Sequence, residues 1–174
     1  MNLPLENLLT RRSIRQYKAA QITDEELDAV LLAGTYAPTA VGKQSPFMVA
    51  VQNQEDLSLM SRLNARIWGR DDIDPFYGAP TAVVVFARAG RPNGIQDATL
   101  VMGNLMNAAH AVGLGSCWIN RTKETYELPE GKALLEKWGV TGNWEGVGTC
   151  ILGYTDGKVP EPKPRKPDYI LKIK

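Results

Sequence analysis

The segment from Asp97 to Val112 has helical spacing, yet its apolar side chains cover nearly the whole circumference. A helix of this kind must be buried on every side, either in a core or between subunits. The chain has 174 residues, which suffice for one ordinary domain and not for two. Few layers are then available to cover the helix. We therefore expect a homodimer with this helix at the subunit interface.

Helices and strands alternate along the rest of the chain. The apolar patterns predict further helices over 24–34, 56–64 and 132–138, and strands over 47–51, 81–87, 116–119 and 148–153. Asp24 is the expected cap of the first of these helices, with Thr23 and Glu26 at capping-box spacing. No internal repeat is visible, so one domain accounts for the pattern.

Three arginines and a serine fall within five residues near the N-terminus, at Arg11-Arg12-Ser13-Ile14-Arg15. Guanidinium groups stay protonated and present planar donor forks, which suit a phosphate dianion. Arginine-rich helix ends are also common on solvated surfaces, so the cluster alone leaves both interpretations open. A second basic cluster, Lys163-Pro164-Arg165-Lys166, lies near the other end of the chain. The pair favours phosphate binding, because two separated clusters can close on one anion.

The overall charge is nearly balanced, with a formal net charge of +1. Basic clusters in such a chain are local features, and a nucleic-acid partner is not expected. No run approaches the roughly 20 apolar residues that a membrane-spanning helix needs. The first residues lack the positive start and the apolar stretch of a signal peptide. We therefore expect a cytoplasmic protein with no membrane partner.

Side chains suited to catalysis are scarce. His110 is the single histidine, so a Ser-His-Asp or Cys-His mechanism would have to use it, and it has no carboxylate nearby in the sequence. Cys117 and Cys150 lie in apolar runs and, with one histidine, cannot form a metal site. Gly113-Leu114-Gly115 lacks the third glycine of the dinucleotide fingerprint. We expect no metal and no catalytic side chain, and infer that an organic cofactor carries any reactivity.

The tail from Val159 to Pro167 alternates prolines with charges, which enforces an extended path with few backbone donors. It finishes in Tyr169-Ile170-Leu171-Lys172-Ile173-Lys174, which has the composition of a strand. We expect this C-terminal arm, residues 159–174, to cross the dimer and add to a sheet edge of the other subunit. The alternative is a frayed terminus.

Several segments together resemble the nitroreductase family of flavin-dependent oxidoreductases, in a compact form without long insertions. Each segment alone is of modest specificity, but their order and spacing agree with the family over nearly the whole chain. In chain order they are Arg11-Arg12-Ser13-Ile14-Arg15, Ala37-Pro38-Thr39-Ala40 through Gln44, Asp74-Pro75-Phe76-Tyr77-Gly78-Ala79-Pro80, Gly113-Leu114-Gly115-Ser116-Cys117-Trp118-Ile119, Leu152-Gly153-Tyr154 and Lys163-Pro164-Arg165-Lys166.

The resemblance implies a single α+β domain over 1–174, with a central, mostly antiparallel sheet flanked by helices. It also implies an intertwined homodimer with two FMN sites at the subunit interface. By similarity, the ribityl phosphate is held by residues of the two basic clusters, with Arg12 contributing backbone or side-chain contacts. These residues are Arg11, Arg12, Ser13 and Arg15 near the N-terminus and Arg165 and Lys166 in the tail.

The same resemblance assigns two further groups of cofactor-binding residues. Along the isoalloxazine ring it places Pro38, Thr39, Ala40 and Gln44 from one subunit and Cys117, Trp118, Ile119 and Asn120 from the other. Backbone N–H groups near Ile119 and Asn120 are the expected partners of flavin N5. Phe76 and Tyr77 either form an aromatic lid over the open ring face or pack their own loop. The loop departs from the family pattern at Gly42, Ser45 and Phe47, and Asn64 is a loose counterpart of a flavin-contacting asparagine.

The function implied is ping-pong redox catalysis. NADH or NADPH reduces bound FMN by hydride transfer to N5, and a small electron-poor acceptor such as a nitroaromatic, a quinone or free flavin then takes the electrons. A specialised relative within the fold would instead perform flavin breakdown or dehalogenation. From other classes of protein, the alternatives are a non-catalytic FMN-binding carrier or sensor and a purely structural dimer. The short segment from Trp68 to Gly78 leaves the ring face open and favours catalysis.

Overall fold

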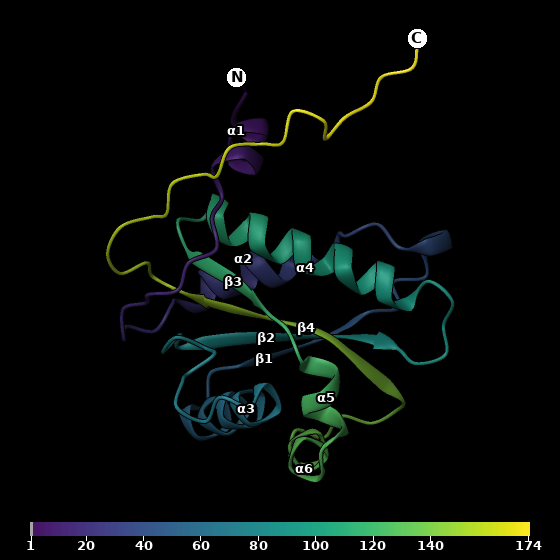
Figure 1. Ribbon diagram of the computed structural model, residues 1–174. Helices are drawn as coiled ribbons and strands as arrows, with labels where there is room; N and C mark the ends of the chain where they lie inside the picture. Colours follow the sequence, from purple (N-terminus) through teal and green to yellow (C-terminus); the bar gives the residue numbers. More distant parts are fainter. Residues whose placement is uncertain (1) are drawn as a thin grey trace.

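The computed structural model describes residues 2–174 and arranges them as one sheet between two layers of helices (Figure 1). The strands lie in the order β1-β2-β4-β3, and every neighbouring pair is antiparallel. Their bounds are Phe47–Val51 for β1, Thr81–Arg88 for β2, Gly115–Ile119 for β3 and Trp144–Gly153 for β4. The predicted α+β class, with an antiparallel central sheet flanked by helices, is confirmed.

Two groups of helices cover the two faces of the sheet (Figure 1). One face packs against α2 (Asp24–Thr35) and α4 (Gly94–Ala111), and the other against α3 (Gln54–Trp68), α5 (Thr122–Glu127) and α6 (Pro129–Lys137). A further helix, α1 (Leu3–Thr10), stands against the outer side of α4, where Asn7 Nδ2 donates to the carbonyl oxygen of Asn107 at 3.0 Å. Within residues 2–174, no helix is long and apolar enough to cross a membrane.

Strand β2 lies at the centre of the core. Its side chains alternate between the two faces, so that Val83 and Val85 contact the α4 layer while Val84 and Phe86 contact the α3 layer. All four side chains have no exposed surface. A strand buried on both faces reads as a continuous apolar run, which is why this segment gives the strongest strand pattern in the sequence.

Helix α4 buries only one of its faces within the chain. Val101, Met102 and Leu105 pack against the sheet, whereas Ile95 and Leu100 on the other side are 43% and 47% exposed. The expectation that this helix is covered at a subunit interface is not tested by the single chain, which within residues 2–174 places only α1 against this outer side. The homodimer that would cover this face stays a prediction.

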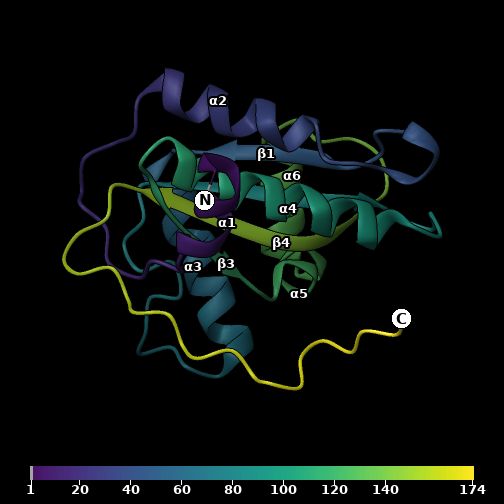
Figure 2. The same cartoon turned by 90° about the horizontal axis from the view of Figure 1, so that it is seen from above.

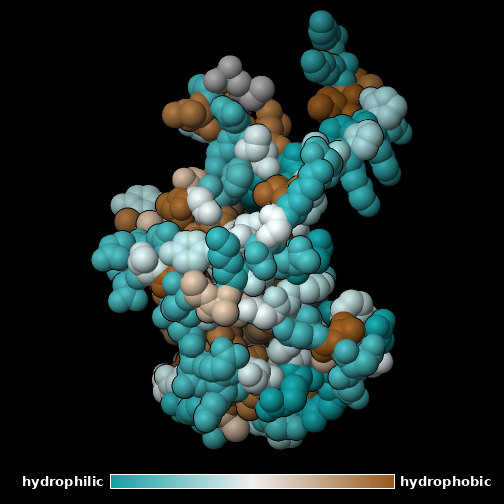
Figure 3. All heavy atoms as spheres, turned by 90° about the vertical axis from the view of Figure 1, so that its left-hand side faces the viewer, coloured by the Kyte–Doolittle hydropathy of each residue, from teal (hydrophilic) through white to brown (hydrophobic). Residues whose placement is uncertain are grey.

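Helix α1 adds to the uncovered apolar surface. None of its residues is buried, and its exposed leucines are Leu3, Leu5, Leu8 and Leu9. Figure 3 shows apolar atoms at the upper left of the molecule, where α1 lies. An isolated helix of this length is marginal in water, and within the described chain α1 is held by its contacts with α4.

Helix ends differ from the prediction for local reasons. Thr23, and not Asp24, is the cap of α2: its hydroxyl oxygen accepts from Glu26 N at 3.2 Å, and the Glu26 carboxylate accepts from Thr23 N at 2.9 Å. The short helix α5 was not predicted, because its six residues are mostly polar and carry no apolar period. Helix α5 follows Arg121, which adopts a left-handed backbone conformation with a φ of 69° in the turn after β3.

The C-terminal arm leaves the body of the molecule along an extended path (Figure 2). Residues 159–174 contain neither a helix nor a strand, and all of them are exposed. Tyr169 and Leu171 expose 82% and 86% of their surface. The predicted strand-like ending is thus absent from the single chain, because a strand needs a neighbour to pair its backbone groups. Its addition to another subunit stays a prediction.

Candidate functional site

The first basic cluster lies along the edge of β3 that β4 leaves free. Ile14 N donates to the carbonyl oxygen of Ser116 at 2.9 Å, and Ser13 and Ser116 form a parallel bridge. The Ile14 side chain is buried, and Tyr17 Oη donates to the Ile14 carbonyl oxygen at 2.8 Å. The structure therefore brings together two of the predicted cofactor-binding segments, residues 11–15 and the strand that ends at Ile119.

The arginines of the cluster have different surroundings. Arg12 Nη1 donates to the carbonyl oxygens of Leu9 and Arg11, both at 2.8 Å, and so closes the C-terminal end of α1. Arg15 is exposed, with its guanidinium carbon 6.0 Å from the centre of the Tyr77 ring. Arg11 Nη1 and Arg12 Nε are buried without a hydrogen-bond partner in the described chain. Among residues 2–174, no ion pair involves these three arginines, so their positive charge is not balanced locally.

His110 lies beside the cluster near the end of α4. Its Nε2 is 2.8 Å from Thr10 Oγ1. Partial burial, followed by the charges of Arg11 and Arg12, lowers the pKa of His110 below its ordinary value of 6.5. Burial and the two charges both favour the neutral imidazole, so the cluster contributes to the lowered pKa of His110.

The side chains of β3 point alternately to the two faces of the sheet. Trp118 packs over Gly148, where an added Cβ would lie 2.7 Å from the indole, and its Nε1 is buried without a partner in the described chain. Cys117 and Ile119 are buried on the opposite face, at 2% and 6% exposure. A contribution of these two residues to cofactor binding would therefore come from their backbone groups.

Both thiols are held in the protonated form. Burial raises the pKa of Cys117, with Arg15, Ser13 and Arg11 acting in the opposite direction. Burial also raises the pKa of Cys150 to about 12. Neither thiol is a nucleophile at neutral pH, because the thiolate is the reactive form.

The turn after β3 is fixed by α3. Asn64 is buried, and its Nδ2 donates to the carbonyl oxygen of Asn120 at 2.6 Å. Arg121 Nη1 donates to Asn64 Oδ1 at 3.4 Å, and the Arg121 guanidinium carbon lies 4.3 Å from the centre of the Trp68 ring. Asn64 therefore holds the backbone at Asn120, a role that its position in the sequence does not reveal.

Phe76 and Tyr77 have different roles. Phe76 is only 5% exposed and packs in the core under α3, so its assignment to a lid is wrong: the apolar layer between α3 and the sheet takes up its ring. Tyr77 is half-buried, has a φ of 54° and faces Arg15. Its assignment to a lid stays a prediction.

The 38–45 loop lies at the opposite end of α4 from the cluster. Ala40 N donates to Asp97 in the first turn of this helix, whereas the cluster adjoins His110 in its last turn. At 1.5 Å per residue these two points are about 20 Å apart along the helix axis. An open hollow of about 660 Å³ beside the loop is lined in part by Pro38, Thr39 and Gln44.

The second basic cluster stays apart from the first within the chain. Arg165 and Lys166 are exposed, and neither forms a hydrogen bond or an ion pair with the rest of residues 2–174. Their predicted contact with the phosphate therefore requires the arm of another subunit or a different path of the arm.

A second hollow lies away from these residues. A cavity of about 570 Å³ lies between α3 and the 71–79 loop, with the Arg66–Glu130 ion pair, at 2.9 Å, on its lining. In the part of the chain that the structure describes, no group of three histidine, cysteine or acidic residues is placed to hold a metal ion. The basic cluster, the strand β3 and the 38–45 loop are thus the candidate functional site.

The sequence matches the model of the Nitroreductase family over residues 8–74 and 69–154. The chain belongs to the nitroreductase family. A solved nitroreductase with bound FMN from Bacteroides fragilis is 31% identical, with 100% of both chains covered and a TM-score of 0.91. A protein of Archaeoglobus fulgidus, provisionally named NADH dehydrogenase/NAD(P)H nitroreductase, is 31% identical over 86% of this chain and 84% of its own. The NADPH-flavin oxidoreductase of Vibrio harveyi is 27% identical over 98% of this chain and 73% of its own. The predicted family is confirmed.

One departure of this nitroreductase from the family pattern has a structural role. Ser45 Oγ donates to Asp97 Oδ2 at 3.2 Å, so the residue that separates Gln44 from Pro46 ties the loop to α4. Asp97 was missed from the sequence, because an acidic residue in a first helical turn is explained by the helix dipole alone.

We predict that the pKa of His110 lies below 6.5 and that Arg11→Gln raises it, because the substitution removes one of the two charges that oppose its protonation. The single histidine makes a proton NMR titration unambiguous. Since the folded-state pKa is depressed, the stabilisation linked to His110 is present above pH 6.5 and is lost as the pH falls through the folded-state pKa.

The matched control for this titration is Arg66→Gln, which removes a cation paired with Glu130 on the other side of the sheet. It should leave the His110 titration unchanged. An unchanged pKa in Arg11→Gln would show that the cluster does not act on His110.

Proposed function

We propose that this chain is an FMN-dependent NAD(P)H oxidoreductase that passes electrons from NADH or NADPH to a small electron-poor acceptor, such as a nitroaromatic, a quinone or free flavin. The observation that carries the proposal is the unpaired cluster Arg11–Arg15 beside β3, in a chain of the nitroreductase family. Support also comes from the relative of Bacteroides fragilis, which was solved with FMN.

The polar atoms left without partners fit a phosphorylated flavin. Arg11 Nη1, Arg12 Nε and Trp118 Nε1 are buried donors that the chain itself does not satisfy. A buried donor without an acceptor costs about 1–3 kcal/mol, so a ligand that supplies acceptors here recovers that free energy. A phosphate dianion suits the two guanidinium groups, and a heteroaromatic ring with carbonyl oxygens suits an indole N–H.

The residues of the chain bind and orient, and none is placed for acid or base chemistry. Arg11, Ser13 and Arg15 would hold the phosphate, with Arg165 and Lys166 of an arm closing on it. The backbone between Ile119 and Asn120 would face N5 of the ring. When bound, FMN supplies the chemistry of accepting and donating a hydride at N5.

The arrangement of the site supports a homodimer. Within one chain, the 38–45 loop and the basic cluster are tied to opposite ends of α4, about 20 Å apart along its axis. A two-fold axis across the outer face of α4 would place the loop of one subunit beside the cluster of the other, because an isologous interface reverses the direction of the partner element. The exposed leucines of α1 would join the same interface.

Reduction of the bound flavin tests the proposed function. Stopped-flow mixing of the FMN-loaded protein with NADH or NADPH should bleach the oxidised flavin absorbance, and a nitroaromatic or a quinone added afterwards should restore it. Flavin that stays oxidised with both nucleotides would refute the proposed oxidoreductase function. The remaining interpretation would then be a non-catalytic FMN-binding carrier or sensor. Product analysis with and without oxygen separates flavin breakdown and dehalogenation from simple electron transfer.

Arg15→Ala should weaken FMN binding roughly 10- to 150-fold, because it removes a charge-assisted hydrogen bond of about 1.5–3 kcal/mol to the phosphate. Fluorescence titration of the apoprotein with FMN measures the dissociation constant. Lys18→Ala removes an exposed cation three residues further along and should leave the constant nearly unchanged. Equal affinities of the wild type and Arg15→Ala would contradict the assignment of Arg15.

The double substitution Leu5→Ser and Leu8→Ser should weaken dimerisation by at least tenfold, because burial of one leucine contributes about 1.5–3 kcal/mol. These side chains are 52% and 56% exposed in the single chain, so its folding should be little affected. Sedimentation velocity over a range of concentrations measures the dimer. Lys132→Ser, on the opposite face of the molecule, is the control, and a monomeric wild type would refute the homodimer.

A further inference from the structure

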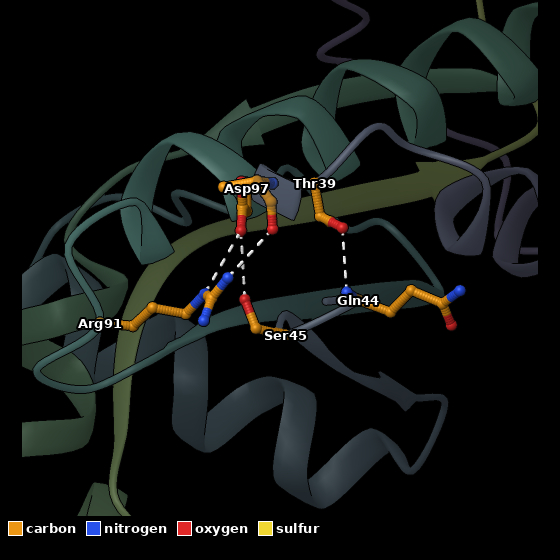
Figure 4. A network of polar contacts seen from close by, with 6 residues as sticks. Thr39, Gln44, Ser45, Arg91 and Asp97 are labelled. Carbon is orange, nitrogen blue, oxygen red and sulfur yellow. Dashed lines mark hydrogen bonds and ion pairs between the residues drawn. The ribbon is translucent and has the colours of Figure 1, made fainter. Parts of the chain in front are cut away.

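A buried carboxylate fastens both ends of the 38–45 loop to α4 (Figure 4). Asp97 is 3% exposed; its Oδ1 accepts from Ala40 N at 2.8 Å, and its Oδ2 accepts from Ser45 Oγ at 3.2 Å. Arg91 adds a third attachment, since its Nη2 donates to the carbonyl oxygen of Ala40 at 3.1 Å while its Nε lies 3.7 Å from Asp97 Oδ2. The two ends of the loop are thus joined to one side chain.

The part of the loop between these attachments is strained and exposed. Val41 and Gln44 have φ values of 49° and 48°, in the left-handed region that a β-branched residue such as valine rarely adopts. Val41 is also 87% exposed, so packing does not compensate for the strain. One internal hydrogen bond, from Gln44 N to Thr39 Oγ1 at 2.9 Å, closes the turn. Strain of this kind persists where the surroundings fix the backbone, and it is typical of ligand clamps.

We propose that Asp97 is a positioning residue for the flavin ring, acting through the 38–45 loop across the subunit interface. The proposal rests on the proposed function. Asp97 fixes Ala40 and Ser45, and through them sets the face that Pro38, Thr39 and Ala40 present to the ring held by the other subunit. Ser45 is then the residue that lets this loop close on the carboxylate.

The carboxylate is required by Arg91. Asp97 accepts from Ala40 N and Ser45 Oγ, and its Oδ2 also lies 3.7 Å from Arg91 Nε. An asparagine could keep both loop contacts, because a hydroxyl can accept as well as donate, but its NH₂ group would face a guanidinium that has donors only. Asp97→Asn therefore keeps the size of the side chain and removes the pairing with Arg91, which also holds the carbonyl oxygen of Ala40.

The test compares FMN with riboflavin, which has the same ring and no phosphate. Asp97→Asn should weaken the binding of both ligands by the same factor of about 10, and Ser45→Ala by about 3-fold. The polar contacts that these variants lose position the loop against the ring and do not touch the phosphate. Arg15→Ala should weaken the binding of FMN and leave the binding of riboflavin unchanged. The visible circular dichroism of the bound flavin should also change in Asp97→Asn and Ser45→Ala, since the ring sits against a displaced loop.

Glu55→Gln is the matched control, because Glu55 is an exposed carboxylate in the first turn of α3 and has no contact with the loop. If Asp97→Asn fails to fold, Ser45→Ala carries the test, since it leaves the Asp97–Arg91 pair intact. Wild-type affinities and an unchanged dichroism in both variants would overturn the positioning role alone. A wild type that binds neither ligand would overturn the proposed function as well.

Discussion

Helix α4 can bury only one of its apolar faces against the sheet of its own chain. The inner face is required by β2, whose two faces are both fully buried and need a covering layer on each side. The outer face remains apolar at Ile95 and Leu100, and α1 adds its exposed leucines beside it. Apolar surface left in water forgoes about 25 cal/mol per Å², and the proposed homodimer would recover part of it at this face. The same helix carries an attachment of the candidate site at each end.

The sequence predicted the parts of the fold that depend on local periodicity. The apolar run at residues 81–87 and the long apolar segment after Asp97 correspond to β2 and α4, because burial on a strand or helix leaves a direct trace in composition. Element ends were less predictable. Thr23 and Asp24 are both good capping residues, and the reciprocal bonds with Glu26 decide between them. The last residues, after Tyr169, have the composition of a strand, but pairing depends on a neighbour that one chain does not provide.

In the candidate site, too, some features follow from the local sequence and others depend on tertiary contacts. The backbone bond from Ile14 to Ser116 joins the Arg11–Arg15 segment to β3, whereas the role of this segment in phosphate binding stays a prediction. Phe76 could not be assigned from sequence, because an aromatic residue in a polar loop fits a lid and a core position equally well. Asn64 and Asp97 act on loops distant in the sequence, so their roles are properties of the tertiary structure.

The basic cluster combines buried guanidinium donors with the absence of an ion pair in the described chain. Arg66, Lys123 and Lys137 each lie within hydrogen-bond distance of a carboxylate, which balances their charge on the surface. Arg11 and Arg15 have no such partner in the described chain, although the formal net charge is only +1 and acidic residues are almost as frequent as basic ones. A carboxylate beside the cluster would compete with a bound phosphate for the same donors and repel its charge. A cluster of arginines with buried, unpaired donors is therefore suited to anion binding, whereas unpaired cations on the exposed surface are solvated by water.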